Sequence, residues 1–210
     1  MADIARLYDD RTTAILAGAK SAFAQKGFDG ASMQDLARAA GMSAGNFYRY
    51  FPSKNAIVAA MIDVDLAGVK QDFEVIVTSA DPAQALFDTM CHRIDTLDCD
   101  DGPLWAEIDA AALRRPEIGQ VVGRMELEIG QFLVAIFSRI SGLPLADAAR
   151  EFTGHAAFLI MLFKGASQRL SGRGSQLPDQ TRTQLRALIL QTIEQTLTDV
   201  AAARRPSEES

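Results

Sequence analysis

The sequence predicts an all-α protein of about nine helices, and two observations support this fold class. Apolar residues recur at steps of three and four along most of the 210 residues, and no alternating run typical of a half-buried strand interrupts them. Proline, glycine and serine punctuate the chain where helices should begin or end. The main predicted breaks lie at Gly27, Gly41, Pro52, Pro116 and Gly142.

The first 55 residues predict three short helices. We expect them over residues 11–26, 33–40 and 44–50. Gly27 should end the first, and Gly41 should supply the left-handed residue between the second and third. Ser32 and Asp35 have the spacing of a capping box at the start of the second helix. Two helices joined by a glycine turn predict a helix-turn-helix, a motif whose second helix enters the major groove of DNA.

Longer apolar stripes follow in the rest of the chain. They predict helices along residues 58–76, 86–97, 118–136 and 185–200, and the last stripe comprises Leu185, Leu188, Thr192, Thr196 and Val200. Residues 156–163 are apolar on every side, which predicts a helix buried on more than one side. We expect a DNA-binding domain over residues 1–55, a helical sensing and dimerisation domain over 56–203 and a polar tail over 204–210.

The net charge of −6 is unusual for a protein that binds nucleic acid, but it is unevenly distributed. Residues 1–55 hold seven Lys and Arg against five Asp and Glu, whereas the rest of the chain holds fourteen against twenty-two. This distribution is compatible with phosphate contact by the N-terminal part alone. The longest apolar run, residues 156–163, is far shorter than the roughly 20 residues of a membrane span. With no signal-peptide pattern, we expect a cytoplasmic protein without a membrane partner.

The N-terminal quarter resembles the DNA-binding signature of the tetracycline-repressor (TetR) family. The matching residues are Ile15, Ala19, Phe23, Gly27, Phe28, Ser32, Leu36, Ala37, Ala40, Gly41, Met42, Ser43, Gly45, Phe47, Tyr48, Tyr50, Phe51, Ser53 and Lys54. A weaker similarity to a sensor-domain helix of the family continues over residues 104–116. Many members carry Lys where this chain has Ala44, which leaves the operator sequence open.

The chemistry of this segment suits double-stranded DNA. Hydroxyl and ammonium groups can bind phosphate oxygens, and the resemblance assigns that role to Tyr48, Tyr50 and Lys54. Side-chain amides offer the paired donor and acceptor that adenine requires. The predicted base-reading residues are Gln34, Ala44, Gly45 and Asn46, with Arg49 on a guanine or a phosphate.

The sequence predicts neither a catalytic site nor a metal or cofactor site. His92 and His155 lack the spacing of zinc ligands. The acidic segment 98–102 misses the positions of a calcium loop, and the glycine-rich segment 171–175 lacks a phosphate-binding lysine, so we expect a turn and a connector. Cys91 and Cys99 are too few for a disulfide framework.

The resemblance implies a regulator that is released from its operator by a small molecule. Aromatic and methionine side chains suit a mainly apolar ligand, and we expect Met90, Trp105, Met125, Phe132 and Phe158 as pocket walls, although each also fits a core position. Glu107 or His92 could anchor polar atoms. A homodimer through the last two long helices is expected, with Ile193→Glu splitting it. The alternatives are an activator, a ligand-independent regulator and, more distantly, a helical binding protein or an enzyme.

Overall fold

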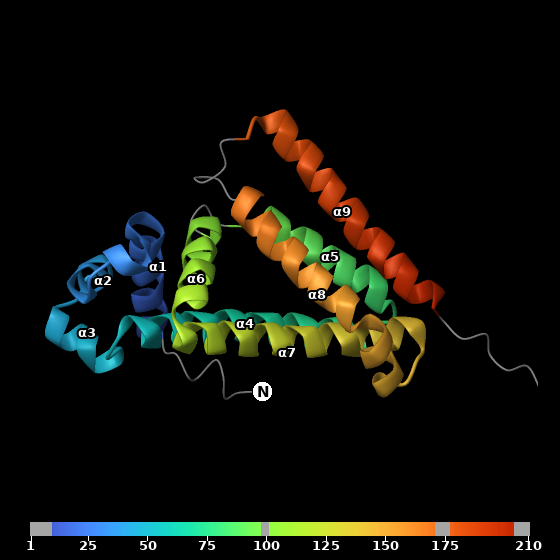
Figure 1. The fold of residues 1–210 in the computed structure, drawn as a ribbon, viewed down its shortest axis with the longest axis horizontal. Coiled ribbons are helices and arrows are strands. Elements are labelled where there is room, and N and C mark those ends of the chain that lie inside the picture. The colour runs from blue at the N-terminus through green and yellow to red at the C-terminus, as the bar shows by residue number, and fades with distance from the viewer. Residues whose placement is uncertain (1–9, 98–100, 171–176, 204–210) are drawn as a thin grey trace, which may run out of the picture. The chain divides into compact units, whose positions relative to one another are not determined.

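The computed structural model describes residues 10–97, 101–170 and 177–203 of the chain. Within these ranges it forms nine α-helices and no β-strand, so the predicted fold class and number of helices are confirmed (Figure 1). The predictions for the glycine-rich connector and the polar tail lie outside the described residues, as does most of the acidic turn.

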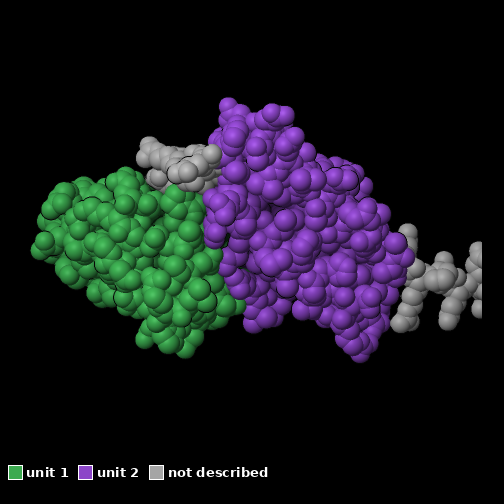
Figure 2. Space-filling model, turned by 45° about the horizontal axis from the view of Figure 1, so that its top comes forward, with its two compact units in different colours: residues 1–68, 98–125, 171–174 green, residues 69–97, 126–170, 175–210 purple. Residues whose placement is uncertain are grey.

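The helices form two compact units, coloured separately in Figure 2. The first unit comprises residues 1–68, 98–125 and 171–174, and the second comprises residues 69–97, 126–170 and 175–210. Helices α4 (Lys54–Thr78) and α7 (Pro116–Ser141) have residues in both units. The first unit also contains α6 (Asp101–Arg114), in addition to the three short N-terminal helices. The domain boundary at residue 55 therefore stays a prediction from the sequence.

The first unit begins with α1 (Asp10–Gly30), α2 (Met33–Ala39) and α3 (Ala44–Tyr50). The predicted bounds of the last two agree with the structure to within one residue, because capping groups close to each end determine them. In α1 the helical geometry breaks at Gly27, whose φ of 73° lies in the region that favours glycine. The core of this unit contains the fully buried side chains of Phe23, Phe28, Leu36, Phe47 and Ile57.

The second unit contains α5 (Pro82–Asp95), α8 (Leu145–Leu170), α9 (Asp179–Ala202) and the later parts of α4 and α7. Its apolar core is built around Phe73, Phe137 and Phe152, with contributions from every one of these helices. Four ion pairs join neighbouring helices at its surface: Asp72–Arg93, Lys70–Glu128, Glu126–Lys164 and Asp95–Arg186. Because exposed pairs contribute only about 0–1 kcal/mol each, the apolar core supplies most of the stability.

The buried face of α9 differs from the predicted stripe. The inward face of α9 consists of Ile189, Ile193, Thr196, Leu197 and Val200, whereas Leu188 of the predicted stripe is 60% exposed. Residues 156–163 of α8 expose Phe158 and Met161 in the single chain, so the expected burial of this helix on more than one side stays a prediction. The apolar residues of α9 indicate that one side of the helix is buried, but they can be grouped into more than one stripe. Packing against the other helices decides which stripe faces the core.

Among the described residues, no single helix is both long and apolar enough to cross a membrane. Helices α7 and α8 reach that length and composition only as a pair, which is bent by 115° at its break.

Gly18 provides a test of the packing between α1 and α2. A Cβ atom at this position would lie 2.6 Å from the carbonyl oxygen of Ala39, and backbone cannot yield as a flexible side chain can. We expect Gly18→Ala to lower the free energy of unfolding by about 1–3 kcal/mol in urea denaturation, despite the better helix propensity of alanine. Gly123→Ala is the control, because its Cβ would meet no atom within 4 Å. Equal stability of the two variants would contradict the close approach.

Candidate nucleic-acid interface

The turn between α2 and α3 is held by backbone hydrogen bonds. Gly41 has a φ of 66°, and its N–H donates to the carbonyl of Arg38 while the N–H of Met42 donates to that of Ala37. This pair of bonds is the Schellman arrangement, which satisfies carbonyls that the end of a helix leaves free. The turn therefore fixes the direction in which α3 leaves α2.

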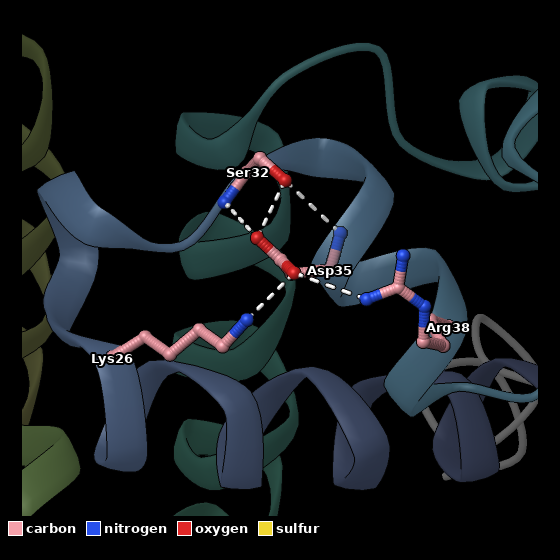
Figure 3. Close-up of polar contacts among 4 residues, drawn as sticks. All are labelled: Lys26, Ser32, Asp35 and Arg38. Carbon is pink, nitrogen blue, oxygen red and sulfur yellow. Dashed lines mark hydrogen bonds and ion pairs between the residues drawn. The ribbon is translucent and has the colours of Figure 1, made fainter.

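The start of α2 is tied to α1 through Asp35 (Figure 3). The hydroxyl of Ser32 accepts the N–H of Asp35, and the Asp35 carboxylate accepts both the N–H and the hydroxyl of Ser32. Lys26 of α1 donates to the same carboxylate at 2.6 Å, and Arg38 lies 3.4 Å from it. Hydrogen bonds from Lys26 and then from Ser32 hold the pKa of Asp35 well below its usual range.

Helix α3 rests on the fully buried ring of Phe47, which lies 6.0 Å from the ring of Phe51. At its start, the hydroxyl of Ser43 accepts the N–H of Asn46 at 3.4 Å. Because Phe47 faces inward, the opposite side of the helix is open to solvent. Gly45, Tyr48 and Arg49 are exposed there, and Tyr48 exposes half of its surface.

The structure brings seven of the eight predicted DNA-binding residues onto the helix-turn-helix. Gln34 is exposed on α2, and Ala44, Asn46 and Tyr50 are half-buried on α3 beside the exposed residues of that helix. All seven side chains therefore have surface that is accessible to a bound DNA, and their contacts with DNA stay a prediction.

Lys54, the eighth, is the first residue of α4, and its ammonium is engaged within the protein. Its Nζ donates to the carbonyl of Phe28 at 2.6 Å and to that of Asp29 at 3.3 Å. It also lies 4.8 Å from the centre of the Phe28 ring. An ammonium has three donors, so these bonds reduce but do not remove its capacity to bind phosphate. No pattern in the sequence indicated the partners, because backbone carbonyls carry no residue signature.

The five predicted pocket residues divide between the two units. Trp105 and Met125 belong to the first, whereas Met90, Phe132 and Phe158 belong to the second. Phe132 stacks on Phe73 with ring centres 5.2 Å apart, and Met90 packs against the same core. Phe158 is exposed. Because the five residues are divided between two units, the expected pocket stays a prediction from the sequence.

The possible polar anchors lie in different surroundings. His92 is exposed on α5, whereas the carboxylate of Glu107 on α6 accepts the backbone N–H of Phe28 at 2.9 Å. Glu107 thus contacts the C-terminal end of α1, a role that sequence reasoning missed. The described residues contain no group of three or more His, Cys, Asp or Glu side chains that could hold a metal ion.

Comparison with known proteins shows similarity at the level of the sequence and of the fold. The sequence profile described as "Bacterial regulatory proteins, tetR family" matches residues 15–61, which cover α2, α3 and their flanking turns. The transcriptional regulator EthR of Mycolicibacterium smegmatis is 42% identical over 80 residues. Residues 15–61 of the chain are therefore similar to the TetR-family DNA-binding segment, and the chain spans about a third or less of the length of the relatives it matches. The resemblance to TetR-family transcriptional regulators that is seen in the sequence is thereby confirmed.

The sequence similarity to individual relatives covers only part of each chain. The match to the M. smegmatis EthR covers 37% of this chain and 37% of that protein, and the match to EthR of Mycobacterium tuberculosis is 44% identical over 55 residues, or 26% of each chain. The fold extends further. Salmonella enterica GusR is 22% identical and covers 90% of this chain and 94% of its own, with a TM-score of 0.65. A transcriptional regulator from Rhodococcus is 20% identical over 89% of this chain and 97% of its own, with a TM-score of 0.66.

The Asp35 network predicts a specific response to acid. The folded pKa of Asp35 lies below its unfolded value of about 3.9, so the unfolded state binds more protons as the pH falls between the two. The stabilisation is fully present above the unfolded pKa and is lost as the pH falls through the folded pKa. We expect Asp35→Asn to lower the urea midpoint at pH 7, with a difference from wild type that shrinks below about pH 4.

Asp147→Asn is the control for this experiment, because it removes an exposed ion pair with Arg150 inside α8. Its urea midpoint should change little at any pH. A difference between Asp35→Asn and wild type that stays constant from pH 7 to pH 2 would contradict the assigned role of the carboxylate.

Proposed function

We propose that this protein is a DNA-binding transcriptional regulator that inserts α3 into the major groove of an operator. The observation that carries the proposal is the solvent-exposed side of α3. This helix is the second of a helix-turn-helix in which both helices are capped at their N-termini by a serine side chain. A rigid helix of seven residues with a glycine at its second position can approach base edges closely. The TetR-family sequence match covers this motif.

Each predicted contact has a chemical role in this proposal. Asn46 and Gln34 read adenine through their amide groups, and the small Ala44 and Gly45 permit contact with a thymine methyl group. The hydroxyls of Tyr48 and Tyr50 bind phosphate oxygens, which position the protein without reading sequence. Arg49 is exposed and can bind either a guanine or a phosphate.

We also propose that a small, mainly apolar molecule releases the protein from its operator. Support comes from the TetR family and from the flat and flexible side chains of the second unit, where Phe132 and Met90 border the core. Such a molecule must bind the DNA-free state more tightly, since equal affinity for both states shifts no equilibrium. Activation and ligand-independent binding are the alternatives. A compound screen that measures release of bound DNA discriminates between them.

The functional form is proposed to be a homodimer through α8 and α9. The single chain exposes Phe158 and Met161 on α8 and Leu188 on α9, which are large apolar side chains that a second copy can cover. A twofold dimer would present two recognition helices to half-sites about one helical turn apart.

Substitutions on α3 test the DNA-binding proposal. The target is a duplex that the wild-type protein selects from a random library. We expect Tyr48→Phe to weaken binding to all sequences alike, because it removes only a hydroxyl, and Asn46→Ala to change base preference by about 1–3 kcal/mol. Arg139→Gln is the control and should bind as wild type, because Arg139 is exposed on α7, outside both α3 and the proposed dimer helices. Fluorescence anisotropy measures all three. Undiminished binding and specificity in both α3 variants would refute these assignments.

The dimer proposal is tested by charges on the exposed faces. Leu188→Glu should shift sedimentation toward monomer without loss of helicity, because it places a carboxylate in the proposed interface. Leu113→Glu is the matched control, since Leu113 is 91% exposed and belongs to α6, which is not one of the two helices of the proposed interface. The expected dimer-splitting variant Ile193→Glu is unsuitable for this test, because Ile193 is fully buried within the single chain. A buried carboxylate at this position should unfold the protein. A Leu188→Glu protein that remains dimeric would contradict the proposed interface.

A further inference from the structure

Residues 27–29 leave backbone groups that the helix α1 does not satisfy by itself. Gly27 departs from helical geometry, and the next N–H, that of Phe28, donates to Oε2 of Glu107 at 2.9 Å. A Cβ on Gly27 would lie 3.0 Å from the same oxygen. The Glu107 carboxylate therefore lies directly against this break, where the positive φ of Gly27 favours glycine.

Further contacts join the same segment to the end of α6. Asp29 pairs with Arg114 at 3.2 Å and with Arg115 at 2.5 Å, and the hydrogen bond from Arg115 is the main reason that the pKa of Asp29 is lowered. The Arg115 guanidinium also lies 5.1 Å from the centre of the Phe28 ring. Positions 107, 111 and 114 lie on one side of α6, where Ala111 is fully buried, and Arg115 directly follows the last residue of this helix.

The segment is also bound by the first residue of α4. Lys54 donates to the carbonyls of Phe28 and Asp29, and it follows the end of α3 by four residues. Phe28 itself is fully buried and stacks on Phe23 at 5.5 Å. Thus α6 and the start of α4 are linked through the same three residues, by hydrogen bonds to a single peptide segment.

We propose that Glu107 is a positioning residue for DNA binding, which acts on the recognition helix through Phe28 and Lys54. The inference rests on the proposed function and adds a coupling route within the first unit. A packed interior does not deform continuously, so a shift of α6 must either carry residues 27–29 with it or break the Glu107 bond. In both cases the hydrogen bonds from Lys54 to the carbonyls of residues 28 and 29 change. Because Lys54 begins α4 shortly after the end of α3, the position of α3 changes with them. Glu107 thereby makes the geometry of α3 depend on α6.

The test compares Glu107→Ala with Glu107→Gln. Glutamine keeps an acceptor oxygen for the Phe28 N–H, whereas alanine removes it. We expect Glu107→Ala to speed hydrogen exchange at the Phe28 amide and to weaken binding of the selected duplex by about tenfold. Glu107→Gln should restore both. Asp95→Asn is the control, because it breaks the bidentate pair with Arg186 in the second unit and should leave DNA affinity unchanged.

The outcomes separate this inference from the proposed function. Faster exchange in Glu107→Ala with wild-type DNA affinity overturns the positioning role, and unchanged exchange overturns the contact itself. Equal weakening of DNA binding by Asp95→Asn shows a general loss of stability and also overturns the inference. A wild-type protein that selects no duplex overturns the proposed function and this inference with it. Circular dichroism confirms that each variant is folded before binding is measured.

Discussion

The need to satisfy backbone groups after the break in α1 organises the first unit. A helix end leaves N–H and C=O groups without partners, and burial of such groups without hydrogen bonds is costly. Here the Phe28 N–H is bound by Glu107, and the carbonyls of Phe28 and Asp29 are bound by Lys54. Because these partners come from α6 and α4, the break in α1 is contacted by parts of the chain that are distant in sequence. This explains why α6 belongs to the same compact unit.

The helix-turn-helix combines local caps with a few buried rings. Ser32, Ser43 and the turn at Gly41 determine where α2 and α3 begin and end, while Leu36 and Phe47 anchor the inner faces. The caps satisfy backbone groups within a few residues, so the outer face of α3 needs no side chain for its own stability. Its exposed residues are consequently available for contact with another molecule.

Charged side chains in this chain serve structure as well as binding. Of the cations in the first unit, Lys26, Lys54, Arg114 and Arg115 are paired with acids or carbonyls of the same unit. The basic excess of the N-terminal part is therefore a poor measure of the charge free to meet phosphate. Arg49 is exposed on α3, which makes it a stronger candidate for DNA contact than its place in the sequence indicated.

The sequence by itself determined the all-α class, the bounds of α2 and α3, the capping box at Ser32 and the left-handed Gly41. These features depend on hydrogen bonds between residues no more than five apart, so their signals are local. The face of α9 that is buried, the separation of the expected pocket residues into two units and the partners of Lys54 and Glu107 came only from the tertiary structure. Lys54 binds a carbonyl 26 residues away and Glu107 an N–H 79 residues away. Backbone groups at such distances have no sequence signature, and packing alone decides which side chain reaches them.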